Sequence, residues 1–249
     1  MKVKNILISQ PAPQAENHPY AQLAEKHKID IDFRPFIEVV GVSGSDFRKD
    51  KINIADFNGF IFTSRNAVDH FFRMCEELRC EVNTEWKYFC LSEAVAFYLQ
   101  KFVPYRKRKI YPGDGSIKSL VPILKRQRNQ NFLMPTSDIL KPMIPTVLEE
   151  AKIKWTRAIM YNTVASDLSD LEDVKYDVLV FFSPEGIRSL YKNFPDFTQD
   201  KTRIAAFGTS TKRVIEEHNL RLDIPVPTEQ FTSMTQALDA YIKEVNKGK

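Results

Sequence analysis

The amino-acid sequence predicts an α/β protein with parallel, doubly wound sheets and an internal duplication. The strongest observation is a segment that occurs twice, at residues 57–68 and again at 176–187. Each copy is an apolar run that ends at a serine and continues as an amphipathic stretch, which indicates a strand covered on both faces followed by a helix. Strand and helix patterns alternate along the rest of the chain with short connections, and this alternation is typical of parallel sheets.

The first half of the chain predicts an ordered series of strands and helices. An apolar strand at 5–9 leads to a helix over 14–27 and then to an extended stretch over 29–42. Pro35 argues against a central strand through that stretch, because proline cannot donate a ladder hydrogen bond. The later strands and helices of this half are expected at 57–62, 67–78, 88–91, 92–99, 109–112 and 116–126.

The second half repeats this order, which is why we predict a duplication. Its elements are expected at 132–134, 141–151, 155–164, 176–182, 184–193, 204–207, 208–215, 224–227 and 231–245. The extended stretches at 29–42 and 153–164 occupy equivalent places and are the natural crossings between two domains. If both cross, the first domain is formed by residues 1–35 and 168–249 and the second by 40–160, with linkers near 36–40 and 160–167. The sequential alternative, 1–125 and 126–249, stays open.

Composition indicates an ordinary soluble globular protein without a membrane segment. The chain has 249 residues, of which 43% are hydrophobic and 27% are charged. No apolar run approaches the ~20 residues that cross a bilayer, and the amino-terminal run is too short for a signal peptide. Cys75, Cys80 and Cys90 lack the spacing of metal ligands and fit reduced thiols. We therefore expect a cytoplasmic protein that does not bind a membrane.

The net charge of +4 includes a basic cluster at residues 106–109 that could attract an acidic ligand. A solvated surface is the simpler interpretation of such a cluster. No recognised nucleic-acid motif accompanies the local positive charge, so we expect no nucleic-acid partner.

Several familiar kinds of catalytic site are absent from the sequence. Gly113 and Gly115 flank one aspartate without the third glycine of a dinucleotide-binding loop, which argues against nucleotide binding. The four histidines fall on predicted helices or at their edges without partners, so neither a metal site nor a Ser-His pair is supported. These histidines are His18, His27, His70 and His218. The sequence therefore predicts no cofactor and no metal.

What remains is a set of hydroxyl and amide side chains at turns from strand to helix. For any single member, capping of the following helix is the simpler interpretation. As a group they gather at the carboxyl ends of strands, where helix amino termini offer free amide donors to carboxylates. The set comprises Ser9, Thr63, Ser64, Asn66, Ser92, Ser183, Thr209, Ser210, Thr211, Thr232 and Ser233, with Gly208 at the same turn as Thr209. Two such edges facing a common cleft would suit a long, flexible polyanion.

Tyr161 lies on the second crossing segment and would face that cleft if the crossing arrangement holds. A packing role at the hinge is an equal alternative, because tyrosine commonly combines a buried ring with an exposed hydroxyl.

The order and spacing of these motifs resemble those of the uroporphyrinogen-III synthase family. The resemblance rests on residues 62–68, 182–187, 206–211 and 227–233, together with the tyrosine segment at 160–164. It implies two flavodoxin-like domains, the first discontinuous, joined by a two-stranded linker. It further implies a monomeric lyase that needs no cofactor. Whether the protein makes a transient contact with the preceding pathway enzyme stays open.

The resemblance also implies the substrate hydroxymethylbilane, a linear tetrapyrrole that is cyclised with loss of water and inversion of its last ring. In this interpretation Tyr161 hydrogen-bonds the departing hydroxyl, while the turn amides near Ser64, Ser183 and residues 209–211 hold carboxylates. The alternative is a non-catalytic two-domain sensor of an anionic small molecule, since a fold does not fix a function.

Overall fold

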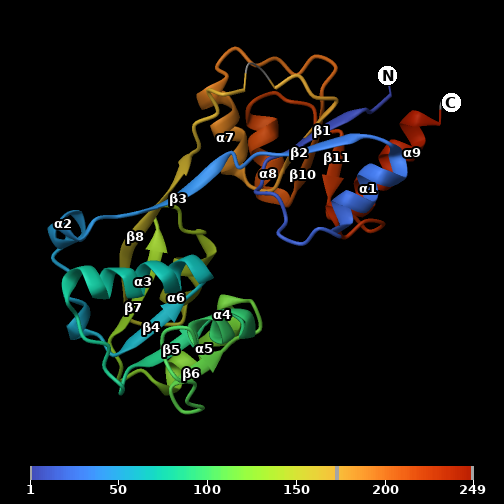
Figure 1. Cartoon of the computed structure of the whole chain (residues 1–249). Coiled ribbons are helices and arrows are strands. Elements are labelled where there is room, and N and C mark those ends of the chain that lie inside the picture. The colour runs from blue at the N-terminus through green and yellow to red at the C-terminus, as the bar shows by residue number, and fades with distance from the viewer. Residues whose placement is uncertain (1, 172–173, 248–249) are drawn as a thin grey trace. The chain divides into compact units, whose positions relative to one another are not determined.

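The computed structural model describes residues 2–171 and 174–247, which form two compact units (Figure 1). Met1–Glu38 and Val164–Lys249 make up unit 1, and Val39–Thr163 makes up unit 2. Residues 172–173 and 248–249 belong to the predicted first domain and lie outside the described residues.

Unit 1 contains a five-stranded sheet in which all neighbouring strands are parallel. The order across the sheet is β11-β10-β9-β1-β2. Taken along the chain, this is the order 2-1-3-4-5 of flavodoxin-like sheets. The strands are β1 (Asn5–Ile8), β2 (Asp30–Phe33), β9 (Val178–Phe181), β10 (Arg203–Phe207) and β11 (Ile224–Val226).

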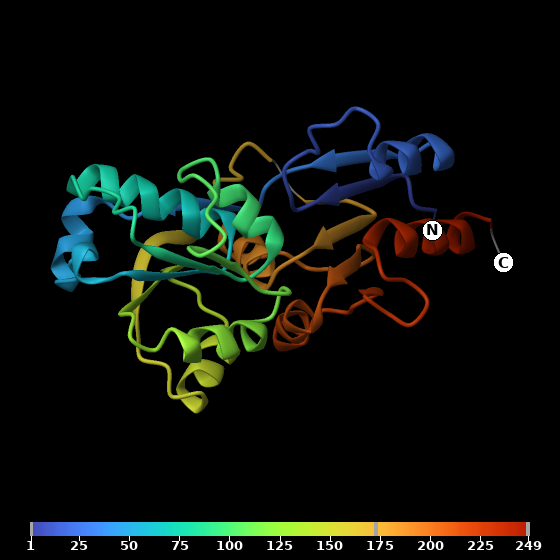
Figure 2. The ribbon, with the colours of Figure 1, turned by 90° about the horizontal axis from the view of Figure 1, so that it is seen from below.

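Helices cover both faces of this sheet because its strands are apolar on both sides. Ile6, Val180 and Ala205 pack on one face under α1 and α9, which lie side by side in Figures 1 and 2. Leu7 and Leu179 pack on the other face under α7 and α8. The helices are α1 (Pro19–His27), α7 (Pro184–Asn193), α8 (Thr209–Glu217) and α9 (Met234–Asn246).

Unit 2 contains the second sheet, whose strand order is β3-β8-β7-β4-β5-β6. The neighbours from β8 to β6 are all parallel. The strands are β3 (Ile37–Gly41), β4 (Gly59–Phe62), β5 (Lys87–Cys90), β6 (Ile110–Pro112), β7 (Phe132–Ser137) and β8 (Trp155–Ala165). Both β3 and β8 extend past the ends of unit 2, so the chain passes between the units along two neighbouring strands.

The two faces of this second sheet are also covered. Phe60, Phe62 and Tyr88 pack with α3 and α4, whereas Ile61 and Phe89 pack with α5 and α6 on the opposite side (Figure 2). The helices are α2 (Gly44–Phe47), α3 (Arg65–Leu78), α4 (Glu93–Leu99), α5 (Ile117–Arg126) and α6 (Met143–Glu150), with short 3₁₀ turns at Arg48–Asp50 and Ile54–Asp56. The predicted α/β class with parallel sheets is confirmed.

The sequence repeats are distributed over both units. Unit 1 takes β1 and β2 from the first repeat and β9, β10 and β11 from the second. Unit 2 takes β4, β5 and β6 from the first repeat and β7 and β8 from the second. Each sheet is therefore completed by strands from both halves of the sequence.

Two predicted boundaries differ from the structure. The helix expected at 14–27 begins only at Pro19, because His18 is extended and caps it while Pro19 occupies the first turn. The strand expected at 132–134 continues to Ser137 despite Pro135. Pairing of β7 with β4 covers only Phe132 and Leu133, so β4 requires no hydrogen bond from Pro135.

Candidate active site

The strand order of each sheet reverses at one place, and open α/β sheets bind ligands outside the carboxyl ends of the strands at that place. In unit 1 the reversal lies between β1 and β9, whose carboxyl ends lead into Ser9 and Ser183. In unit 2 it lies between β7 and β4, which end at Ser137 and lead into Ser64. Hydroxyl side chains thus occur on both sides of each switch point.

Tyr161 and Ser64 meet at the switch point of unit 2. The Tyr161 hydroxyl lies 3.3 Å from Ser64 Oγ, and Ser64 Oγ also accepts a hydrogen bond of 3.1 Å from the amide of Ala67 at the start of α3. The Tyr161 side chain is 7% exposed in a strand that pairs Ser137 with Tyr161. The hydroxyl of Tyr161 on β8 therefore meets the capping hydroxyl of Ser64 at the start of α3.

The charge state of Tyr161 follows from its surroundings. Burial raises the pKa of Tyr161, the hydrogen bond with Ser64 opposes that rise, and the nearby Asp138 carboxylate adds to it. The phenol is consequently protonated at neutral pH and able to donate a hydrogen bond.

The other two candidates of unit 2 lie on the same edge but differ in surroundings. Asn66 is exposed on the first turn of α3. Ser92 caps α4 through its Oγ, 3.4 Å from the amide of Val95, and lines a hollow of about 650 Å³. Glu93 and Asp114 line the same hollow, and their negative charges oppose a carboxylate there. Physical chemistry thus favours an anion beside Ser64 and Asn66 rather than beside Ser92.

In unit 1 the turn after β9 forms the first of three helix starts. Ser183 Oγ accepts a 3.3 Å hydrogen bond from the amide of Gly186 and caps α7, whose first residue is Pro184. Ser9 lies at the end of the neighbouring β1 and is 8% exposed. The serines on the two sides of this switch point differ in access, because Ser183 is half-buried whereas Ser9 is buried.

The turn after β10 is built differently. Gly208 adopts φ +87° as the N-cap of α8, and no side-chain capping bond forms there among the described residues. Thr209 and Ser210 lie inside the first turn and are exposed, and the N-cap position is Gly208, so the side-chain cap that the sequence led us to expect is not formed. Thr211 is fully buried, and its Oγ1 has no hydrogen-bond partner within the described part of the chain. The amide groups at this helix start therefore have no side-chain cap.

The third helix start of unit 1 follows β11. Ser233 Oγ accepts a 3.3 Å hydrogen bond from the amide of Gln236 and caps α9, while Thr232 is exposed beside it. This turn has the geometry of an ordinary capped helix.

An aromatic pair at the edge of unit 1 was not anticipated from the sequence. Phe182 follows β9 and Phe207 ends β10, and their rings stack with centroids 6.2 Å apart and an angle of 24°. Phe207 is 37% exposed, which is unusual for a residue in a strand whose preceding residues are buried. The pair lies between the starts of α7 and α8, so apolar ring surface and amide donors share one edge.

Each of the four histidines contacts another group of the protein. His18 Nδ1 accepts from the amide of Ala21, and His27 Nε2 lies 2.7 Å from Asp239 Oδ1. His70 and His218 stack on tyrosine rings. The partners of His27, His70 and His218 are Asp239, Tyr161 and Tyr191. These partners are distant in the sequence, so the sequence did not reveal the contacts. Groups of three or more potential metal-ligating side chains are not found in the described residues.

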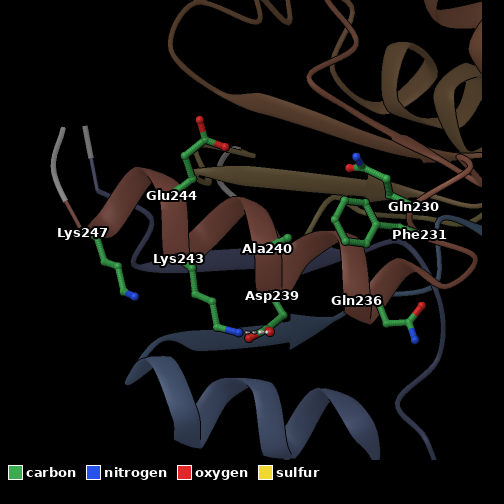
Figure 3. Close-up of a pocket in the computed structure, with 8 residues that line it drawn as sticks. All are labelled: Gln230, Phe231, Gln236, Asp239, Ala240, Lys243, Glu244 and Lys247. Carbon is green, nitrogen blue, oxygen red and sulfur yellow. Dashed lines mark hydrogen bonds and ion pairs between the residues drawn. The ribbon is translucent and has the colours of Figure 1, made fainter.

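Two large hollows in the described residues contain none of the candidate residues. One, of about 790 Å³, runs along α9 and is lined by Gln230, Phe231, Gln236, Asp239, Ala240, Lys243, Glu244 and Lys247 (Figure 3). Its Asp239 and Lys243 form an ion pair of 2.6 Å. The other, of about 1110 Å³, lies at the amino-terminal ends of β1, β9 and β10, opposite the candidate edge. Across residues 2–171 and 174–247, helices long and apolar enough to span a membrane are not found.

Two doubly wound parallel sheets connected by two strands, with helix starts and hydroxyls at their switch points, define a two-domain α/β protein of flavodoxin-like topology. The family model for uroporphyrinogen-III synthase HemD matches residues 18–236 of this chain. The chain therefore belongs to the uroporphyrinogen-III synthase family.

Relatives and solved structures agree with this assignment. The chain is 23% identical to a uroporphyrinogen-III synthase of Chlorobaculum parvum over 241 residues, which cover 89% of this chain and 92% of the relative. It is 24% identical to that of Saccharomyces cerevisiae over 149 residues, which cover 52% of this chain and 54% of the relative.

The solved uroporphyrinogen-III synthetase of Helicobacter pylori superimposes with a TM-score of 0.63 at 17% identity, covering 97% of this chain and 100% of that one. A mutant uroporphyrinogen III synthase of Thermus thermophilus gives a TM-score of 0.57 at 16% identity, with coverage of 98% and 100%. At these identities the superpositions establish the shared fold.

Proposed function

We propose that the chain is a uroporphyrinogen-III synthase, a lyase that cyclises hydroxymethylbilane with loss of water and inversion of the last pyrrole ring. Membership of the family supports the activity. The observation that carries the assignment of chemistry to residues is the protonated Tyr161 hydroxyl, 3.3 Å from Ser64 Oγ at a switch point. A hydrogen-bond donor is what the departure of a hydroxyl group requires.

The reaction needs little from the protein beyond this donor and correct positioning. When the hydroxymethyl group of the substrate loses its hydroxyl as water, the terminal pyrrole becomes an electrophilic azafulvene. The carbon of the last pyrrole that already carries a bridge attacks that electrophile. The older bridge bond at this carbon then breaks, and the freed bridge carbon bonds to the unsubstituted α-carbon of the same ring. That α-carbon loses its proton to solvent, which balances the proton taken up by the departing water, and the ring is left inverted. Tyr161 donates a hydrogen bond to the departing oxygen, which lowers the energy of the separating charge. Positioning then decides which carbon of the last ring attacks the azafulvene.

Helix starts in each unit, considered by itself, offer contacts for carboxylates of the substrate. In unit 2 the relevant amides are those of the first turn of α3, beside Ser64 and Asn66. In unit 1 they belong to the first turns of α7 and α8, beside Ser183 and residues 208–210. Backbone amides and the positive end of the helix dipole bind carboxylates without a lysine or arginine in direct contact. The lack of a side-chain cap on α8 leaves its amides as the most available donors.

The Phe182–Phe207 pair contributes the apolar part of the same interaction. A tetrapyrrole combines flat aromatic rings with carboxylates at their margins, and the edge of unit 1 combines a partly exposed aromatic face with amide donors. Stacking of one pyrrole ring on Phe207 would let its carboxylates reach the adjacent helix starts.

A product assay tests this function. Purified protein is added to freshly prepared hydroxymethylbilane, and the products are oxidised and separated as the type I and type III porphyrins. Type III product above the spontaneous type I closure is the expected result. Binding without type III product would instead favour the non-catalytic sensor. The cytoplasmic location, the monomeric state and a contact with the preceding enzyme stay predictions, which fractionation and light scattering can check.

A further inference from the structure

One stripe of α3 makes contacts that the proposed reaction does not yet use. His70, Arg73 and Glu77 follow each other at helical spacings of three and four and lie on one side of this helix. Arg73 is at the centre of the stripe: its Nε donates to His70 Nδ1 at 3.2 Å, and its Nη1 is paired with Glu77.

The guanidinium of Arg73 also holds the strand that carries Tyr161. Its Nη2 donates to the carbonyl of Met160 at 3.0 Å and to that of Val42 at 2.8 Å. A side chain at Gly41 would bring its Cβ to 2.9 Å from the guanidinium carbon, so the glycine leaves the room that Arg73 occupies. The residue immediately before Tyr161 is thus fixed to α3 through its carbonyl group.

The imidazole of His70 completes the arrangement. It stacks on the Tyr161 ring with centroids 4.8 Å apart and an angle of 16°. Because Nδ1 accepts from Arg73, the proton of the neutral ring is on Nε2. The Tyr161 ring is therefore held on its face by His70, at its hydroxyl by Ser64 and through its neighbour's backbone by Arg73.

We propose that His70 is a positioning residue for Tyr161, and that its imidazole, oriented by Arg73, keeps the phenol hydroxyl beside Ser64. The inference rests on the role proposed above for Tyr161. It also makes the reaction sensitive to acid, because a protonated imidazole cannot accept from Arg73 and would place two cations side by side.

The direction of this pH dependence is set by the groups around the ring. Burial and the charge of Arg73 lower the pKa of His70 from 6.5, while Asp69 on the same helix opposes them. Tyr161 faces the ring from β8 as a neutral phenol, and the charge of Asp138 acts on that phenol. We expect kcat to fall as the pH drops through the lowered pKa of His70, below 6.5.

The test compares His70→Ala and His70→Phe with a matched control, His218→Ala. His218 stacks on Tyr191 with centroids 4.5 Å apart and an angle of 11°, so this control removes the same kind of stack elsewhere in the chain. His70→Ala should lower kcat about tenfold, which corresponds to a modest rise of the barrier. KM should change less than about twofold, because the variant alters the position of Tyr161 and not the proposed carboxylate contacts. His70→Phe should keep most of kcat, since the ring survives, and should lose the acidic limb of the pH profile.

A second measurement does not depend on activity. Nitrogen-15 NMR of the wild-type chain, with the His70 signals assigned by their loss in His70→Phe, should show the Nε2–H tautomer at neutral pH. A proton on Nδ1 would overturn the inference, and so would His70→Ala with the kcat of the His218→Ala control. Tyr161→Phe distinguishes the proposed role of Tyr161 in the reaction from the positioning role of His70. If kcat falls in Tyr161→Phe but not in His70→Ala, only the positioning role fails. If Tyr161→Phe itself keeps the wild-type kcat, the role of Tyr161 fails and the positioning role falls with it.

Discussion

The Tyr161 hydroxyl and Ser64 Oγ lie 3.3 Å apart although the residues are 97 positions apart in the chain. Tyr161 lies in the long strand β8, whereas Ser64 caps helix α3, which follows strand β4 of the same sheet. Because Ser64 Oγ also accepts from the Ala67 amide, its own proton is free to point away from the helix or toward the phenol oxygen. When Ser64 Oγ donates to the phenol oxygen, the Tyr161 hydroxyl is able to donate its own proton to a third oxygen.

Replacing Tyr161 by phenylalanine removes the proposed donor and keeps the ring. We expect kcat to fall at least about tenfold, about 1.4 kcal/mol of barrier, because the lost interaction acts on the departing hydroxyl. KM should change little, since the proposed carboxylate contacts are backbone amides that this substitution leaves in place. Tyr191→Phe is the matched control, because Tyr191 also stacks on a histidine. A Tyr161→Phe variant as active as this control would remove Tyr161 from the chemistry.

Replacing Ser64 by alanine removes both a cap and the partner of Tyr161. Loss of the cap should cost about 1 kcal/mol of unfolding free energy, measured by urea denaturation. Ser116→Ala provides the comparison, because Ser116 caps α5 with a 3.2 Å bond to the Lys118 amide. Both variants should lose similar stability, and only Ser64→Ala should lose kcat. Equal kcat values in the two variants would reduce Ser64 to a capping residue.

Phe207→Ala tests whether the aromatic edge binds the substrate. Stacking contributes about 0.5–1.5 kcal/mol beyond buried area, so we expect KM to rise by up to about tenfold. Phe102→Ala is closely matched, since Phe102 is 40% exposed and stacks on Phe72 at 4.5 Å. Binding of uroporphyrin, followed by its fluorescence, gives the same comparison without turnover. If both variants bind uroporphyrin as the wild type does, no pyrrole ring stacks at this edge.

Gly208→Ala tests the helix start without a side-chain cap. Gly208 and Gly115 have φ of +87° and +102°, and a Cβ at either position would meet open space. The backbone cost of alanine should be similar at both, on the order of 1–3 kcal/mol. Only Gly208→Ala places a methyl group beside the proposed carboxylate donors, so only this variant should raise KM. Steady-state kinetics of both variants against their melting temperatures would separate strain from lost binding.

The cluster around Asp239 predicts how acid affects stability. Burial raises the pKa of Asp239, but hydrogen bonds from Lys243, Lys26 and His27 outweigh it and hold the pKa well below 3.8. A carboxylate whose pKa is lower in the folded state stabilises the fold at higher pH, and this contribution is lost as the pH falls below about 5. Asp239→Asn should therefore weaken the dependence of the urea midpoint on acid pH. Asp50→Asn, an exposed change in unit 2, should leave it unaltered. Parallel curves for both variants would contradict the prediction.

Many of the strands, helices and helix caps could be predicted because they follow from short-range sequence patterns. The repeated segment, the apolar runs and the serine caps at 64, 92 and 183 are local features, and the structure has strands and caps at those places. The late start of α1 was also encoded locally, in the proline at position 19, but the apolar and polar pattern of 14–27 masked it.

The missed features of the site depend on which strands become neighbours. Phe182 and Phe207 stack only because β9 and β10 are adjacent, and His70 meets Tyr161 only because α3 packs over β8. The pair of His70 and Arg73 was visible as a helical spacing of three, and this was the one available signal. Residue type alone could not distinguish exposed Ser210 from buried Thr211, since both follow the same glycine.

The exchange of strands between the two repeats has a further consequence. Neither half of the gene product contains all the strands of any one sheet, so neither half alone could build a complete layer. A break in the exposed turn at Arg128 and Asn129 would separate the halves while leaving every sheet strand uncut. Two polypeptides made separately on either side of that turn should remain unstructured alone and assemble into an active heterodimer when mixed.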